Sequence, residues 1–318
     1  MSAPTFVGFR NLIYEKSGIY FPDNKKYVLD SRLASRLAEH NCTTFEEYLA
    51  LLKTDAWRDK ELPALFNAVT TNETFFFRDL PQLQAFNDLI LPAMIKENQG
   101  TKRLKIWSAA CSTGDEPFTL AILLLERGRE GAGSSGKEPA LAGSGLAGAM
   151  TPGAGGCKGE KESVLADSRA GGCNGDLGGW NVEVAASDIS EAALGSARRG
   201  AYGPYAMRHV SPPLLSRYFT MEDGLHCVKP EVKRLVRFAH INLFDSARVK
   251  LMKGMDIIFC RNCLIYFDDK AKKRVVDSFY DCLNPRGYLL IGFSESLHNV
   301  TRAFHPISSH KTVVYQKV

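Results

Sequence analysis

Residues 105–122 read KIWSAACSTGDEPFTLAI, and this stretch decides the fold. An apolar run leads into small residues at Ser112-Thr113-Gly114, and a helical pattern begins at Pro117. Small residues let a ligand approach the backbone closely, and a helix N-terminus offers free N–H groups. The stretch therefore predicts a nucleotide-type binding turn at the carboxyl end of a parallel strand.

The charges in this turn restrict the ligand. No Gly-Lys-Ser/Thr follows, which excludes a P-loop, and Asp115 and Glu116 place negative charge where a pyrophosphate would lie. A ligand with a cationic centre and an amino group fits better, and S-adenosylmethionine has both. A strand–helix turn without a ligand is the alternative interpretation of this segment alone.

Short apolar runs and helical stretches alternate on either side of this turn, a pattern typical of a parallel sheet with crossover helices. We expect strands at 104–109, 182–186, 235–239, 255–259, 288–292 and 312–316, and helices at 117–127, 190–199 and 269–283. Residues 284–287, Asn-Pro-Arg-Gly, are expected to form a turn.

The chain before residue 70 has a different pattern. Apolar residues recur there at helical spacing, and Thr43 or Thr44 followed by Glu46 and Glu47 predicts a helix start. We therefore expect an all-helical domain at 1–69 and an α/β domain at 70–318.

Two segments interrupt the α/β pattern. Residues 128–179 contain about 16 of the 27 glycines and few aromatic residues, so we expect a disordered insertion there. Residues 205–236 include Asp223-Gly224 between short apolar runs, which predicts a hairpin in a small antiparallel β subdomain.

Composition excludes several classes of protein. The net charge of +5 is too weak to indicate nucleic-acid binding by itself, and no apolar run approaches the roughly 20 residues of a membrane span. The first residues lack the pattern of a secretory signal, so we expect a cytoplasmic protein whose eight cysteines are free thiols. No cluster has metal-ligand spacing, and we expect no metal.

Polar residues follow several of the expected strands. Asp188 ends the second strand, where a carboxylate can accept hydrogen bonds from ribose hydroxyls. Asn242 follows the strand at 235–239, and Asn262 and Tyr266 follow the strand at 255–259. Because the carboxyl ends of parallel strands meet at one edge, we expect these side chains near Gly114; an exposed strand-end residue without a role remains the alternative for each.

The motifs together resemble a known family. TTNETFFFRD at 70–79, WSAACSTGDEP at 107–117, SDIS at 187–190, INLF at 241–244, FCRNCLIYFD at 259–268 and GYLLIGFSESL at 287–297 occur in the order found in CheR-type chemotaxis receptor methyltransferases. The helical start also matches, through SGIYFPDNKKYVLDSRLASRL at 17–37. The resemblance covers nearly the whole chain except the insertion. It implies the class I S-adenosylmethionine-dependent methyltransferase fold, with an N-terminal all-α domain and a small antiparallel β subdomain.

The resemblance also implies site residues. Those implied to contact the cofactor are Asn72, Thr74, Arg78, Glu116, Asp188, Asn242, Leu243, Asn262 and Cys263. Cys263 departs from the aliphatic residue usual there, and Asp115 from the usual Glu. Arg78 and Tyr266 would act at the reacting centre, where Arg78 holds one oxygen of a substrate glutamate and Tyr266 orients the carboxylate. A carboxylate is ionised at pH 7, so no general base is required.

The implied partner is the cytoplasmic domain of chemotaxis receptors. Lys25, Arg32 and Arg36 fall on one face of a helix near 24–38, and the resemblance implies that this face contacts the receptor; a solvated face is the alternative. A receptor tail peptide bound at the β subdomain stays open, and we expect a monomer.

Two other functional classes remain. One is a methyltransferase for nucleic acid or a small molecule, but a DNA adenine enzyme would carry Asn/Asp-Pro-Pro-Tyr/Phe where this chain has Arg261-Asn262-Cys263-Leu264. The other is an S-adenosylmethionine-binding signalling module without receptor methylation activity. Arg78 and Tyr266 argue against such a module.

Overall fold

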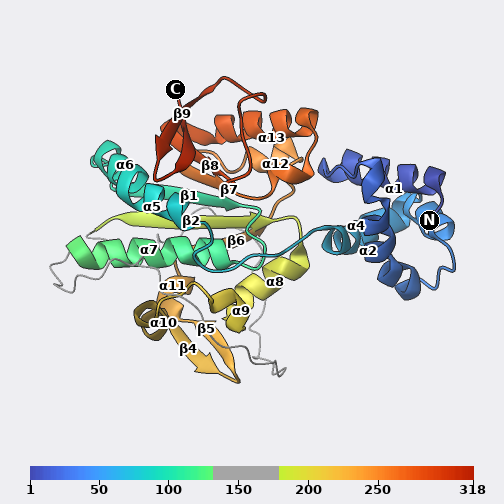
Figure 1. The fold of residues 1–318 in the computed structure, drawn as a ribbon, viewed down its shortest axis with the longest axis horizontal. Coiled ribbons are helices and arrows are strands. Elements are labelled where there is room, and N and C mark those ends of the chain that lie inside the picture. Colours follow the sequence, from blue (N-terminus) through green and yellow to red (C-terminus); the bar gives the residue numbers. More distant parts are fainter. Residues whose placement is uncertain (132–178) are drawn as a thin grey trace.

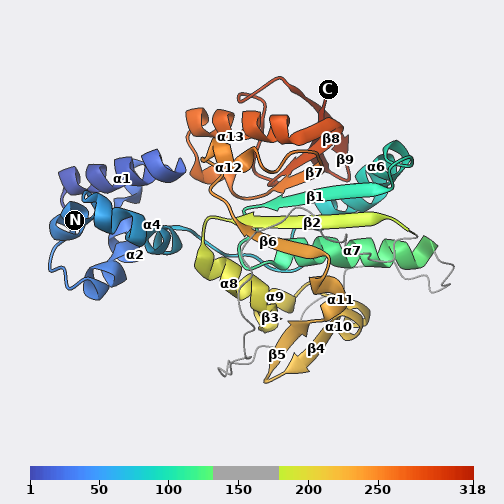
Figure 2. The same cartoon turned by 180° about the vertical axis from the view of Figure 1, so that it is seen from behind.

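The computed structural model describes residues 1–131 and 179–318, and Figures 1 and 2 show the fold from opposite sides. The helix that follows the first strand, α7 (Asp115–Gly131), continues past residue 128, where the insertion was expected to begin. The expected start of the insertion is therefore wrong by at least four residues, and the part of it at 132–178 lies outside the described residues.

The first 69 residues form a helical unit at one end of the molecule (Figure 1). Its helices are α1 (Ala3–Ser17), η1 (Asp23–Lys25), α2 (Lys26–Glu39), α3 (Phe45–Leu52) and α4 (Asp55–Val69). The expected start of α3 is confirmed, because the Thr44 side chain accepts from the Glu47 amide and Glu47 reaches back to the Thr44 amide. Phe9, Leu33 and Tyr48 are fully buried in this unit's core.

A seven-stranded sheet forms the centre of the rest of the chain. Its strands are β1 (Arg103–Ala109), β2 (Asn181–Asp188), β6 (Val236–His240), β7 (Met255–Cys260), β8 (Leu283–Ile291), β9 (Phe304–Ser309) and β10 (Thr312–Lys317). They lie in the order β6-β2-β1-β7-β8-β10-β9. The first five are parallel, and β10 is antiparallel to both of its neighbours.

Both faces of the sheet are covered, as the unbroken apolar strands require. In β7, Ile257 and Phe259 join the core on one face, whereas Ile258 packs on the other. Successive side chains of a strand point to opposite faces, so one buried strand contributes to two cores.

Helices supply the two outer layers (Figure 1). One layer contains α12 (Ser246–Val249) and α13 (Asp269–Cys282), and the other contains α7 and α8 (Glu191–Arg199). A further helical segment before β1 consists of α5 (Leu80–Ala85), η2 (Phe86–Ile90) and α6 (Leu91–Glu97).

A second, three-stranded sheet of order β3-β5-β4 extends from the larger one. Its elements are β3 (Ala201–Tyr202), α9 (Pro204–Met207), α10 (Pro212–Tyr218), β4 (Phe219–Glu222), β5 (Leu225–Val228) and α11 (Pro230–Lys233). Asp223 and Gly224 connect β4 to β5 with positive φ angles of 49° and 76°. The expected hairpin is confirmed, since a two-residue turn of this type needs positive φ at both positions.

Near the carboxyl end, one expectation was wrong and one strand was not predicted. Residues 284–287 do not form a separate turn: they lie within β8, where the pairing shifts between Met255↔Leu283 and Ile257↔Tyr288. The extra residues bulge out of the strand, and Arg286 adopts a φ of 61°. The edge strand β9 was not expected, because Pro306 and the polar residues around it conceal the alternation of a strand.

The six cysteines in the described part of the chain are free thiols, as expected. None of the helices within residues 1–131 and 179–318 is long and apolar enough to cross a membrane.

Candidate functional site

The turn after β1 has an unusual backbone. Ala110 and Ser112, neither of which is glycine, adopt positive φ angles of 63° and 51°, and Gly114 adopts 90°. A Cβ at Gly114 would lie 2.8 Å from the Cβ of Ala197 and 3.1 Å from the Tyr202 hydroxyl, so only glycine lets the turn pack against α8. Strained backbone of this kind concentrates at functional sites.

Asp188, at the end of β2, is buried beside this turn. Its Oδ2 accepts a hydrogen bond from the Ser112 amide at 2.8 Å, and its Oδ1 accepts one from the Ser190 amide at 2.9 Å. Burial raises the pKa of the Asp188 carboxyl, while these backbone hydrogen bonds act in the opposite direction. A carboxylate accepts about four hydrogen bonds, so Asp188 keeps capacity for a ligand's hydroxyl groups.

The loop after β7 carries a buried cation. Only 3% of the Arg261 side chain is exposed, and its guanidinium lies 2.7 Å from Asp79 and 3.1 Å from Glu116. Ser108 donates to the other oxygen of Glu116 at 2.7 Å. Within the described residues, the Arg261 Nε has no hydrogen-bond partner. Arg261 therefore ties β7 to both the 70–79 segment and the first turn of α7.

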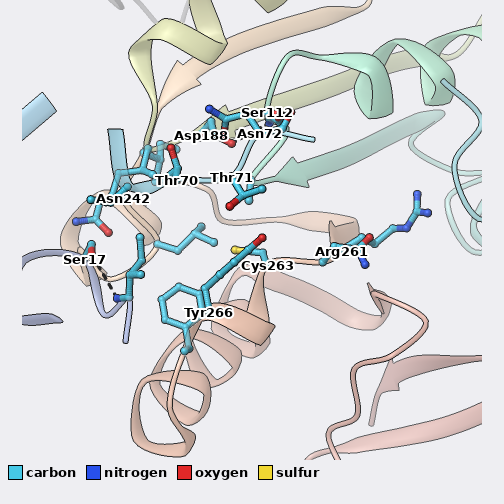
Figure 3. Close-up of a pocket in the computed structure, with 18 residues that line it drawn as sticks. Ser17, Thr70, Thr71, Asn72, Ser112, Asp188, Asn242, Arg261, Cys263 and Tyr266 are labelled. Atoms are coloured by element: carbon cyan, nitrogen blue, oxygen red, sulfur yellow. Dashed lines mark hydrogen bonds between the residues drawn. The ribbon is translucent and has the colours of Figure 1, made fainter. Parts of the chain in front are cut away.

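A cavity of about 700 Å³, partly open to solvent, lies at this carboxyl edge of the sheet. Figure 3 shows Asp188 and Asn72 on one side of it and Tyr266 and Cys263 on another. The all-α unit contributes Ser17 to its wall, together with Ile19 and Val69.

Contacts from the all-α unit hold this wall in place. The Tyr20 amide donates to the Tyr266 carbonyl at 2.9 Å, and Ile19 forms an isolated bridge with Phe267. The Asn242 side chain donates to the Lys16 carbonyl at 2.6 Å. The cavity therefore lies between the two units rather than within one of them.

A second cavity, of about 530 Å³, adjoins the first. Thr71, Ala110, Ser112, Arg261 and Asn262 line both cavities. The second alone is lined by Thr74, Arg78 and Glu116, which places a cation, a hydroxyl and a carboxylate within reach of its contents.

The expected site residues divide between the two cavities. The first collects six of the residues expected to contact the cofactor, Asn72, Asp188, Asn242, Leu243, Asn262 and Cys263, together with Tyr266. The second receives Thr74, Arg78 and Glu116. Arg78 and Tyr266 thus line adjoining cavities rather than a single one.

Arg78 retains freedom to meet a ligand. About 31% of its side chain is exposed, and its Nη1 donates to the Glu73 carbonyl at 3.0 Å. Its carboxylate neighbour, Asp79, lies 4.0 Å from Nε and is already 2.7 Å from Arg261. Most of the Arg78 donors are therefore unused by these contacts.

A further cation lies close to Arg78 outside the two cavities. The Arg208 guanidinium lies 3.3 Å from the Phe75 ring centre, and the Arg78 guanidinium lies 5.6 Å from the same centre. Phe75 lines the second cavity, so positive charge gathers at its rim.

The expected basic face of α2 does not form as a free surface. Arg36 is only 11% exposed and is ion-paired with Glu39 and with buried Glu61. Arg32 donates to the Val69 carbonyl and the Thr71 hydroxyl. The helical spacing is correct, but two of the three charges bind partners within the chain because α4 packs against α2; Lys25, in η1, remains exposed.

Several lining residues were not expected at the sequence level. They are Ser17, Ile19, Val69, Thr70, Thr71, Ala110, Ile189, Ile241, Arg261 and Phe267. The position of Arg261 directly after β7 could have indicated it, by the reasoning that identified Asn262. Nothing in the local pattern of Ser17 and Ile19 indicates a contact with a strand edge more than two hundred residues away.

The donor set of the two cavities fits S-adenosylmethionine. Asp188 can accept from ribose hydroxyls, and apolar Ile241 and Leu243 line the same cavity, where an adenine ring could pack. Asp188 and Glu116 supply carboxylates suited to the ligand's cationic groups, and Arg261, which lines both cavities, is paired with Glu116. Within the described residues there is no group of three or more His, Cys, Asp or Glu side chains that could hold a metal ion.

Comparisons with known proteins agree with this fit. The sequence profile described as "CheR methyltransferase, SAM binding domain" matches residues 72–137 and 166–313, and "CheR methyltransferase, all-alpha domain" matches residues 4–70. Chemotaxis protein methyltransferase 2 of Vibrio cholerae is 32% identical over 313 residues, covering 98% of this chain and 92% of that protein. Chemotaxis protein methyltransferase 1 of Pseudomonas aeruginosa is 30% identical, covering 97% of this chain and 96% of that protein.

A third relative, the chemotaxis protein methyltransferase of Vibrio parahaemolyticus, is 33% identical over 312 residues, which cover 97% of this chain and 94% of that protein. The two profiles together cover the helical unit and the parallel strands of the large sheet. The chain therefore belongs to the CheR methyltransferase family, with the family's all-α domain and an S-adenosylmethionine-binding domain of the class I methyltransferase fold.

Proposed function

We propose that this protein transfers the methyl group of S-adenosylmethionine to glutamate side chains of chemotaxis receptors and forms glutamyl methyl esters. The observation that carries the proposal is the second cavity, lined by Arg78 and contiguous with the cavity that fits the cofactor. A guanidinium donates charge-assisted hydrogen bonds to a carboxylate oxygen, so this cavity suits a glutamate side chain.

Different residues would contact different parts of the cofactor. The cofactor supplies an electrophilic methyl group on a sulfonium. Asp188 would hold the ribose, Asn242 and Leu243 would border the adenine, and Asn262 and Cys263 would lie beside the methionyl part. Asn72, which lines the first cavity, and Thr74 and Glu116, which line the second, would complete the contacts.

Arg78 and Tyr266 would act on the substrate. Arg78 would hold one oxygen of the glutamate carboxylate, which leaves the other free to attack, and the Tyr266 hydroxyl would orient it. Since the carboxylate is already ionised at neutral pH, alignment and exclusion of water are the protein's main contributions.

The partner we propose is the cytoplasmic domain of a chemotaxis receptor, which also makes the protein cytoplasmic. Residues 1–69 would form a receptor-recognition domain, with exposed Lys25 as its free contact, and residues 70–318 the methyltransferase domain. A receptor tail peptide would add to the sheet at the outer edge of β4, since β4 ends the three-stranded sheet. We propose a monomer that binds no nucleic acid.

Radiolabelled methyl transfer to membranes that contain chemotaxis receptors tests the proposal. The label should appear on the receptor and be released by mild base, as methyl esters are. Receptors whose methylated glutamates are replaced by glutamine provide the control and should stay unlabelled. A protein that binds S-adenosylmethionine but labels no receptor would instead be the binding module considered above.

A further inference from the structure

The carboxylate of Glu295 links two loops at the edge of the cofactor cavity. Glu295 follows β8, yet its side chain reaches the loop that follows β7. Its Oε2 accepts hydrogen bonds from the Asn262 amide at 3.1 Å and the Gly292 amide at 2.5 Å, and its Oε1 accepts one from the Ile265 amide at 3.0 Å. One side chain therefore provides acceptors for three backbone N–H groups in two loops.

The β7 loop needs such acceptors because of its shape. Asn262 adopts a positive φ of 57°, a conformation that costs energy for a residue other than glycine. A short 3₁₀ turn, η3 (Leu264–Tyr266), follows it, and the amide of Ile265 belongs to this turn. The Asn262 amide is partly buried and the Ile265 amide is exposed, and the hydrogen bonds that both donate to Glu295 stabilise the conformation that these residues adopt.

The surroundings of Glu295 are shaped to its carboxylate. A Cβ added at Gly292 would lie 2.7 Å from Glu295 Oε2 and 2.8 Å from the Asn262 nitrogen, so the contact exists only because residue 292 is glycine. Burial raises the pKa of the Glu295 carboxyl, and the hydrogen bonds from the three amides oppose this effect.

The loop held by Glu295 carries residues of the cofactor cavity. Asn262, Cys263 and Tyr266 all line that cavity, whereas Glu295 does not. Within the 3₁₀ turn, Leu264 is buried in the core and Ile265 is exposed, while the flanking Cys263 and Tyr266 line the cavity.

We propose that Glu295 is a positioning residue, which holds Asn262, Cys263 and Tyr266 in the arrangement that S-adenosylmethionine binding and methyl transfer require. The effect on S-adenosylmethionine binding rests on the cofactor site alone, and only the effect on methyl transfer rests on the proposed function. A residue that merely braces the fold would lower stability without a specific effect on the cavity.

Asp256 offers a matched control at the opposite end of β7. Its buried carboxylate also accepts hydrogen bonds, from the Lys105 amide at 2.8 Å and from the Asn284 side chain at 2.8 Å. Both Glu295→Gln and Asp256→Asn remove one charge and keep the side-chain shape. The two variants should therefore lose similar stability. A difference between them in cofactor binding would then arise from where the carboxylate lies and not from the loss of a charge.

Cofactor binding and amide exchange without cofactor provide readouts independent of the receptor. Calorimetry should show S-adenosylmethionine binding at least about tenfold weaker for Glu295→Gln, because the –NH₂ that replaces one carboxylate oxygen cannot accept from a backbone N–H and the negative charge is lost. Hydrogen exchange of the peptide that covers 261–267 should be faster in the same variant. Asp256→Asn should stay within about twofold of the unsubstituted protein in both measurements.

Turnover distinguishes positioning from binding. At saturating S-adenosylmethionine, each of Glu295→Gln and Tyr266→Phe should lower the turnover rate. The double variant should lose less than the product of the two single decreases, because Tyr266→Phe has a smaller effect once Tyr266 is already displaced. Gly292→Ala, which displaces the carboxylate without removing it, gives a second route if Glu295→Gln fails to fold. Unchanged cofactor affinity and unchanged hydrogen exchange in either folded variant would overturn the proposal. Because neither measurement uses a receptor, this outcome can be told apart from a failure of the proposed receptor methylation.

Discussion

The Asp188 carboxylate accepts a hydrogen bond from the Ser112 amide, with Oδ2 and the nitrogen 2.8 Å apart. The residue at the tip of β2 thereby holds the turn after β1, in which Ser112 has a φ of 51°. The same carboxylate lines the cofactor cavity, so it serves the turn and the ligand together.

Replacement of Asp188 should therefore affect two properties. Asp188→Ala should weaken S-adenosylmethionine binding by roughly 1–3 kcal/mol, the scale of lost charge-assisted hydrogen bonds, and should also lower the thermal midpoint. Asp188→Asn keeps an acceptor for the Ser112 amide. Its thermal midpoint should therefore stay close to that of the parent, while its affinity for S-adenosylmethionine falls. Calorimetry that finds full affinity in a folded Asp188→Ala variant would remove the ribose assignment.

Arg78 should matter for turnover rather than stability. Because its side chain is partly exposed and its main hydrogen bond is to one carbonyl, Arg78→Ala should change the free energy of unfolding little. Methyl transfer at saturating S-adenosylmethionine should fall by about 10²-fold or more, since alignment supplies much of the rate. Arg78→Lys should also be strongly impaired, because an ammonium lacks the two-pronged geometry.

One result would contradict the proposed role of Arg78. Near-normal turnover by folded Arg78→Ala at saturating cofactor would contradict its role with the substrate carboxylate. The family assignment would stand, because it depends on the whole chain.

Asp115, at the start of α7, gives a pH-dependent prediction. Burial raises the pKa of its carboxyl from 3.8 to about 6. The folded protein then holds the proton more tightly than the unfolded chain, so ionisation of Asp115 removes stability as the pH rises from about 4 to about 6. Asp115→Asn should therefore be more stable than the parent at pH 7, by up to about 3 kcal/mol, and equal to it below pH 4.

Urea unfolding at both pH values measures this difference. The parent and the variant should converge at low pH, where Asp115 is protonated in both states. A variant that is less stable than the parent at pH 7 would show that the ionised carboxylate contributes more, through Thr113, than its burial costs.

The pairing of Arg36 predicts a structural effect where a receptor contact was expected. Arg36→Ala leaves buried Glu61 without its guanidinium partner and should destabilise the all-α domain by about 3 kcal/mol. Lys25→Ala, at an exposed position, should leave the thermal midpoint unchanged while it weakens receptor binding. Equal midpoints for the two variants would contradict the structural role of Arg36.

The sequence by itself determined the layout of the sheet and the edge where the site lies. Apolar runs and turn residues are local signals, so they predicted six of the seven large-sheet strands, the β4–β5 hairpin and the strand-end positions of Asp188, Asn242 and Asn262. Edge strand β9 and the bulge in β8 were not predicted, because they depend on pairing with neighbouring strands and not on a local sequence pattern.

Only the tertiary structure decided which charges pair. Arg36 turns toward Glu61 because α4 packs against α2, and Arg261 meets Glu116 across 145 positions of the chain. Glu295 reaches the amide of Asn262 for the same reason: β7 and β8 lie side by side. Hydrophobic periodicity specifies a surface to bury, whereas the partner of a buried charge depends on which elements meet, and that is settled only when the chain folds.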